Sequence, residues 1–184
     1  EFGGDYSSIV PLIPTGKGTS ASHLSWTDDK FVDGEASIIE ISGVYKKYHC
    51  PMARTVLLGK PDQKKIDTMK RTREAIQAGI DATKPGNTAD DVAQAFWKVL
   101  DKYGIEKKSR TGYSIGIGYP PDWGEHTLNI QKGDKTVLQK NVCFHMIAVM
   151  QFGEWGVESS ESIRVSDNGA ENFYKFPGEL HIKN

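Results

Sequence analysis

The chain has 184 residues, 38% of them hydrophobic and 26% charged, which is typical of one globular domain and excludes an extended disordered chain. Lys and Arg (23) nearly balance Asp and Glu (24), so the net charge of −1 provides no single-signed field to attract nucleic acid or an anionic membrane. No apolar run approaches the ~20 residues that span a bilayer. Two cysteines, Cys50 and Cys143, are too few for a disulfide framework or a zinc cluster. We therefore expect a cytoplasmic protein with a small-molecule substrate, and no nucleic-acid or membrane partner.

The chain begins with a loop-rich segment, residues 1–35, in which prolines and glycines recur. The β-branched run 36–42 predicts a strand, and residues 54–58 predict a second one. About ten residues lie between these runs and include Gly43 and Pro51. We expect them to form a hairpin-like connection.

Two helices are expected next. Pro61 is placed to open the first helix, which should end at residues 84–86. Thr88 and Asp91 have the spacing of a capping box at the start of the second helix, and Gly104 is placed to end it. Apolar residues recur at helical spacing in both segments, and their simplest role is core packing.

The C-terminal half contains a glycine-rich, aromatic segment and then strands. Residues 110–128 are expected to form a loop, 142–150 a buried strand, and 157–166 one or two more, before a turn at 167–169. A hairpin, two helices and further strands indicate an α+β fold with an antiparallel-rich sheet.

The pair Gly116 and Gly118 lacks the third glycine and the following helix of a dinucleotide fingerprint. We therefore expect no nucleotide cofactor. The glycines indicate positive φ or a close backbone approach at this position.

Glu40 stands in the middle of an apolar strand, where a carboxylate must be paired, hydrogen-bonded or functional. The pattern leaves a structural and a functional role equally open. Apolar surroundings raise the pKa of a carboxyl group, which suits acid–base chemistry. His145, in another apolar strand, and His23, in a loop, have simpler structural readings as a core and a surface residue. Either Glu158 or Glu161 is placed to meet Glu40 in space.

Two stretches, residues 37–45 and 48–56, resemble the first hairpin of the "pita-bread" catalytic domain shared by aminopeptidase P, prolidase, methionine aminopeptidase and creatinase. The resemblance extends from about residue 9 to 173. It implies an α+β fold in which a curved, antiparallel-rich sheet carries helices on its outer face.

In the metallopeptidases of this family, two aspartates, a histidine and two glutamates hold two metal ions. The matching positions here hold Glu40, Pro51, Tyr113, Ile147 and Ser160. Pro and Ile offer no side-chain donor atom, and Tyr and Ser are poor ligands for a hard dinuclear site. We therefore expect no metal cofactor, which argues against an ordinary Xaa-Pro peptidase.

Creatinase is the metal-free branch of the family, and its catalysis is assigned to a histidine and to glutamates. The resemblance places His23 at that histidine and Glu40 at the first glutamate, with Glu161 or Glu158 near the second. The predicted catalytic residues are therefore His23, Glu40 and Glu161. The predicted substrate-binding residues are Tyr113, His145, Tyr119, Trp123 and Glu158.

The long segment 112–125, together with 10–16 and 48–55, is most similar to the ectoine hydrolase branch. This implies a metal-independent hydrolase of a C–N bond in a small cyclic amidine or guanidino acid, such as ectoine, which would open to an N-acetyl diamino acid. Two alternatives stay open: a metal-dependent Xaa-Pro dipeptidase, and an inactive pita-bread domain that binds peptide or protein.

The family is usually dimeric, so a homodimer is expected. Its members carry a further N-terminal domain, whereas the resemblance starts almost at the first residue, Glu1. Residues 1–184 are therefore expected to be the single C-terminal catalytic domain of a longer protein.

Overall fold

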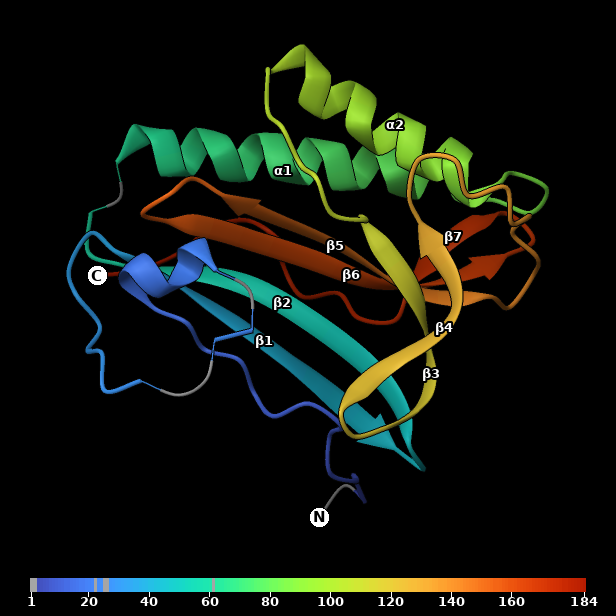
Figure 1. Ribbon diagram of the computed structural model, residues 1–184, viewed down its shortest axis with the longest axis horizontal. Coiled ribbons are helices and arrows are strands. Elements are labelled where there is room, and N and C mark those ends of the chain that lie inside the picture. The colour runs from blue at the N-terminus through green and yellow to red at the C-terminus, as the bar shows by residue number, and fades with distance from the viewer. Residues whose placement is uncertain (1–2, 22, 25–26, 61) are drawn as a thin grey trace.

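A computed structural model describes residues 3–21, 23–24, 27–60 and 62–184. One curved sheet has the strand order β1-β2-β3-β5-β6-β7, with β4 beside β3 and β8 beside β2, and two helices cover one of its faces (Figure 1). Every strand pairing is antiparallel except β2 with β8. This architecture confirms the predicted α+β class and the outer position of the helices. The strands are β1 (Ala36–Tyr45), β2 (Tyr48–Leu58), β3 (Gly112–Tyr119), β4 (Asp122–Ile130), β5 (Cys143–Gln151), β6 (Gly156–Ser166), β7 (Gly169–Asn172) and β8 (His181–Lys183).

The hairpin of β1 and β2 is longer than the sequence pattern predicts. The strands pair from Ala36 with Leu57 to Tyr45 with Tyr48, so the expected ten-residue connection is wrong. The turn consists of Lys46 and Lys47, with φ of 49° and 66°, the left-handed conformation that two-residue hairpin turns require. Asn and Gly are the usual residues in such turns, so two lysines did not indicate one in the sequence. Pro51 is tolerated inside β2 because β3 pairs with β2 only at Tyr48.

The helices begin at side-chain caps. Helix α1 (Gln63–Ala82) follows Asp62, whose carboxylate accepts the Lys65 N–H at 2.8 Å. The predicted opening residue, Pro61, lies outside the described residues. Helix α2 (Ala89–Lys102) has the predicted capping box of Thr88 and Asp91. No helix in the described part of the chain is long and apolar enough to cross a membrane.

The main core lies between the helices and one face of β5 and β6. On β5, Phe144 and Met146 belong to this core, together with Phe96 and Leu100 of α2. Residues on a strand alternate between its faces, so His145 and its odd-numbered neighbours on β5 point to the other side of the sheet. The short 3₁₀ helix η1 (Gly16–Ser20) packs against β1, β5 and β6.

The glycine-rich segment is a hairpin of β3 and β4, so the prediction of a loop is wrong. The glycines do permit a close approach, as predicted. A Cβ atom on Gly118 would lie 2.8 Å from the Trp123 Cα atom, and one on Gly116 would overlap the Glu125 carboxylate. Neither glycine has positive φ.

Side-chain hydroxyls join β2 to β6, which are not neighbours in the sheet. The Ser160 Oγ atom accepts the Ala53 N–H at 2.7 Å. The Thr55 hydroxyl donates to the Glu158 carbonyl at 2.8 Å and accepts the Glu158 N–H at 2.7 Å. These bonds close the curved sheet on its inner side and fix β1 and β2 relative to β6.

Replacing Thr88 with Ala should lower the free energy of unfolding by about 1 kcal/mol, because α2 loses its N-cap acceptor. Chemical denaturation measures this change. The control is Thr88→Ser, which keeps the hydroxyl and should stay close to wild type. Equal losses in both variants would contradict a capping role.

Candidate active site

A small cavity on the inner side of the sheet brings two glutamates and a histidine together. Its volume is about 30 Å³. Glu40 comes from β1, Glu158 from β6 and His23 from the segment after η1. The remaining lining residues are Leu12, Pro14, Ala21, Ile38, Ile147 and Val149.

Both glutamates are buried, and each has an unpaired oxygen. Glu40 is 3% exposed and Glu158 is 5% exposed. The Oε1 atom of each has no hydrogen-bond partner among the described residues. Burial raises the pKa of Glu40 to about 7. Burial also raises the pKa of Glu158 well above its usual range, aided by the charge of Glu40 and opposed by Lys107. At neutral pH the pair therefore holds one or more protons.

His23 stands at the solvent side of this cavity. Its Nε2 atom lies 3.9 Å from the Glu40 Oε2 atom, and its side chain is 63% exposed. Its φ of 55° is in the left-handed region, which is uncommon for a residue other than glycine. The histidine thus lies between Glu40 and solvent.

Glu161, the predicted second catalytic glutamate, lies on the other face of β6. It is three residues from Glu158, and an odd separation reverses the side of a strand. Its Oε1 atom pairs with Arg54 Nη2 at 3.2 Å and with Arg73 Nη1, from α1, at 2.8 Å. The structure therefore places Glu158, and not Glu161, beside Glu40. The assignment of Glu161 is corrected to an ion-pair role.

Tyr113, His145 and Trp123 form a hydrogen-bonded chain. The Trp123 indole N–H donates to the Tyr113 Oη atom at 2.7 Å, and this oxygen lies 2.9 Å from the His145 Nδ1 atom. Tyr113 pairs with His145 across β3 and β5. His145 is completely buried, and its Nε2 atom has no partner within the described part of the chain.

Trp123 and Tyr119, both predicted to bind substrate, do not line the cavity of the glutamates. Trp123 is 1% exposed and lies behind Tyr113, so it supports that side chain. Tyr119 lies at the far end of β3, six residues beyond Tyr113, and is 59% exposed. The structure does not bring Tyr119 to the glutamates.

Sequence reasoning missed the residues that cover Glu40. Leu12, in the loop-rich N-terminal segment, forms two backbone hydrogen bonds of 2.9 Å with Glu40. Leu12 and Pro14 thereby close one side of the cavity. Nothing in the sequence pattern indicates this contact, because an isolated bridge needs only backbone atoms.

The five positions that match the metal ligands of related peptidases do not fit a dinuclear metal centre. Pro51 and Ile147 have no donor atom. The Ser160 hydroxyl accepts the Ala53 N–H, and the Tyr113 hydroxyl is engaged by Trp123 and His145. Only Glu40 retains a free oxygen among them. No group of three or more His, Cys, Asp or Glu side chains among the described residues is arranged to hold a metal ion.

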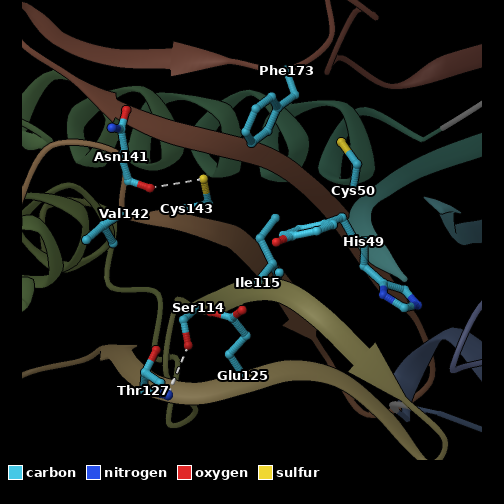
Figure 2. Close-up of a pocket in the computed structure, with 12 residues that line it drawn as sticks. His49, Cys50, Ser114, Ile115, Glu125, Thr127, Asn141, Val142, Cys143 and Phe173 are labelled. Atoms are coloured by element: carbon cyan, nitrogen blue, oxygen red, sulfur yellow. Dashed lines mark hydrogen bonds between the residues drawn. The ribbon is translucent and has the colours of Figure 1, made fainter. Parts of the chain in front are cut away.

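A second cavity, of about 460 Å³, is more open and mainly apolar (Figure 2). Cys50 of β2, Cys143 of β5 and Phe173 border it, and none of the predicted catalytic residues does. Burial raises the pKa of both thiols, which makes them weak nucleophiles. Both cysteines are free and half-buried. The small cavity, with its two buried glutamates, is therefore the better candidate for a catalytic site.

The sequence matches metallopeptidase family M24 over residues 1–168. It is 44% identical over 183 residues to an ectoine hydrolase from Halomonas elongata, covering 99% of this chain and 46% of that protein. The crystal structure of dipeptidase PepE from Mycobacterium ulcerans has a TM-score of 0.84 at 26% identity, covering 94% of this chain and 46% of that one. A prolidase from Thermococcus sibiricus has a TM-score of 0.89 at 22% identity, covering 99% and 49%, which shows the shared fold. The chain spans about half the length of these relatives.

Glu161→Gln should destabilise the protein by about 3–5 kcal/mol, because it leaves the buried Arg54 guanidinium without its carboxylate. The matched variant Glu158→Gln removes no ion pair and should cost much less. Denaturant unfolding of both variants measures the difference. A more severe loss for Glu158→Gln would contradict the assignment of the two faces of β6.

The free energy of unfolding of Glu40→Gln, relative to that of wild type, should increase from pH 5 to pH 8. The folded pKa of Glu40 is raised, so its stabilising contribution is present below its unfolded pKa and is lost as the pH rises through about 7. Gln keeps the neutral form at every pH. The expected gain is on the order of 2–3 kcal/mol, measured by thermal unfolding across that range. A difference independent of pH would show that Glu40 ionises normally.

Proposed function

Because the chain belongs to metallopeptidase family M24, we propose that it supplies the hydrolytic site of an enzyme that opens a C–N bond in a small cyclic amidine acid. Ectoine is the substrate that the comparisons favour, through the 44% identity to an ectoine hydrolase. We further propose that the reaction needs no metal ion. The poor fit of the five ligand-equivalent positions supports this part of the proposal.

The observation that carries the proposal is a concentration of unpaired buried atoms. Five buried side-chain polar atoms lack a partner in the described residues, and three of them belong to Glu40, Glu158 and His145. Native proteins pair about 90% or more of their buried polar groups, because an unpaired one costs about 1–3 kcal/mol. Three such atoms on the inner side of one sheet indicate a site that is completed by a polar ligand and by water.

The two carboxyl groups provide an acid and a base at neutral pH. Burial raises the pKa of Glu40 to about 7, and burial together with the charge of Glu40 raises the pKa of Glu158 well above its usual range, which favours its protonated form. Such a split between neighbouring carboxyl groups is how enzymes assign acid and base roles. A carboxylate in this position also attracts the planar cation of an amidinium group.

In the proposed reaction, Glu40 takes a proton from a water molecule while the water oxygen bonds to the amidine carbon. The new hydroxyl group then loses the second proton of the water and becomes the amide carbonyl as the C–N bond of the ring breaks. The electron pair of that bond and this second proton both go to the nitrogen. His23 transfers the proton from Glu40 to this nitrogen once the two side chains close from their 3.9 Å separation to hydrogen-bond distance in the complex. Ectoine and one water molecule would thus give an N-acetyl diamino acid.

The cavity is large enough for water but too small for the substrate. About 30 Å³ accommodates water molecules, because one water needs about 10–15 Å³ of such space. A substituted six-membered ring needs more room. We therefore expect Ala21 and His23, which cover the cavity beyond the hydrogen bonds of Leu12, to move outward when the substrate binds.

The direct test is ectoine hydrolysis by the full-length protein, with the product identified by mass spectrometry. Glu40→Gln should lower kcat by about 10²–10⁴-fold, because the general base is lost, while the fold is retained. Glu106→Gln, at an exposed position outside the cavity, is the control and should keep much higher activity. Near-normal turnover by Glu40→Gln would refute the proposed role of Glu40.

The alternative function, a metal-dependent Xaa-Pro dipeptidase, is favoured by the fold shared with PepE and prolidase. Metal analysis and a chelator distinguish the two. Ectoine turnover should persist in EDTA, and a Gly-Pro dipeptide should not be cleaved with or without added Mn²⁺. Stoichiometric metal, or dipeptide cleavage restored by Mn²⁺, would favour the alternative.

A further inference from the structure

We propose that His145 donates its Nε2–H to a negatively charged oxygen of the substrate, and that Tyr113 and Trp123 act through His145 by fixing its tautomer. The nature of the substrate rests on the proposed function above. The direction of the hydrogen bonds does not rest on the proposed function, because it is argued from the three side chains alone.

The Trp123 indole has only a donor, so the direction of the chain is determined from that end. Trp123 donates to the Tyr113 Oη atom at 2.7 Å, which occupies an acceptor position of this oxygen. The hydroxyl has one proton, and its other partner is the His145 Nδ1 atom at 2.9 Å. Donation to Nδ1 gives this proton its acceptor among the described residues, whereas the reverse direction would leave the proton unpaired. We therefore assign Tyr113 as the donor to Nδ1 and the proton of the neutral imidazole to Nε2.

The imidazole stays neutral over the physiological range of pH. Burial, with a contribution from the charge of Arg54, lowers the pKa of His145 to about 3. Its Nε2–H group is consequently a buried neutral donor without a partner in the described residues. A buried donor left unpaired costs free energy, which a bound acceptor would recover.

The position of the ring connects this donor to the candidate site. His145 shares one face of β5 with Ile147 and Val149, and both of these line the cavity of Glu40 and Glu158. The charges of both glutamates also contribute to the raised pKa of Tyr113, which places the chain within their electrostatic reach.

An oxygen with negative charge is the acceptor that suits a fixed neutral donor. The two candidates are the carboxylate of the substrate, present from the start, and the oxygen that water adds to the amidine carbon. Neutral imidazole donates to such oxygens without giving up its proton. Because Tyr113 uses its proton on His145, it has none for the substrate, so only the histidine makes this contact.

The tautomer is tested by NMR of the full-length protein labelled with ¹⁵N-histidine. Wild type should show His145 protonated at Nε2 and unprotonated at Nδ1 at neutral pH. Tyr113→Phe removes the proton donated to Nδ1 and should give a mixture of tautomers. A proton on Nδ1 in wild type, or an unchanged tautomer in Tyr113→Phe, would overturn the inference whether or not ectoine is the substrate.

Kinetics test the contact itself. His145→Leu should lower kcat/KM for ectoine by about 10²–10³-fold, the usual effect of removing one such donor. His145→Gln, whose amide reaches the position of Nε2, should recover part of this loss. An effect mainly on KM would identify the substrate carboxylate as the acceptor, and one mainly on kcat the oxygen from water. Ectoine turnover by wild type with no loss in folded His145→Leu would refute the inference and leave the proposed function intact.

Discussion

The contact between β2 and β6 is the constraint on which the candidate site depends. The two strands are not neighbours in the sheet, so side chains must hold them together. Ala53 is the pairing partner of Glu40 on β1, and its N–H is held by Ser160 of β6. Thr55 binds both backbone groups of Glu158. The same few hydrogen bonds that join the halves of the sheet therefore also set the position of one glutamate relative to the other.

The ion cluster on the opposite face of β6 reinforces this contact. Arg54, next to Ala53, pairs with Glu161 and donates to the carbonyl groups of Ser160 and Pro177. A buried guanidinium requires this many partners, because its desolvation is costly. The inner face of β6 shows the contrary arrangement, in which Glu158 is left with an unpaired oxygen. The paired charges on one face of β6 thus support, through the same strand, a carboxyl group on the other face that keeps an unpaired oxygen. Such incompleteness lowers stability and is typical of a site that needs a ligand.

The family alone favours a metallopeptidase, but the side chains at the ligand-equivalent positions do not supply the donor atoms of a dinuclear metal site. Ser160 is used by the fold, Tyr113 belongs to a hydrogen-bonded chain, and Pro51 and Ile147 offer no donor. The scaffold persists because its core lies between the helices and the outer face of the sheet, away from the inner face. Changes on the inner face can therefore alter the reaction without cost to the main core.

The sequence by itself determined the α+β class, both helices with the Thr88 cap, the strands predicted at 36–42 and 142–150, which the structure extends or shifts slightly as β1 and β5, and the unusual burial of Glu40 and His145. These features depend on local periodicity, capping residues and polarity, which act over a few positions. The tertiary structure alone decided that Glu158 meets Glu40, that Glu161 pairs with two arginines, and that Tyr119 lies away from both. The sequence left open whether Glu158 or Glu161 meets Glu40, because nothing in it shows which face of this strand turns toward β1. That choice depends on side-chain contacts between strands more than 100 residues apart in sequence, such as Thr55 with Glu158, and no local pattern records them.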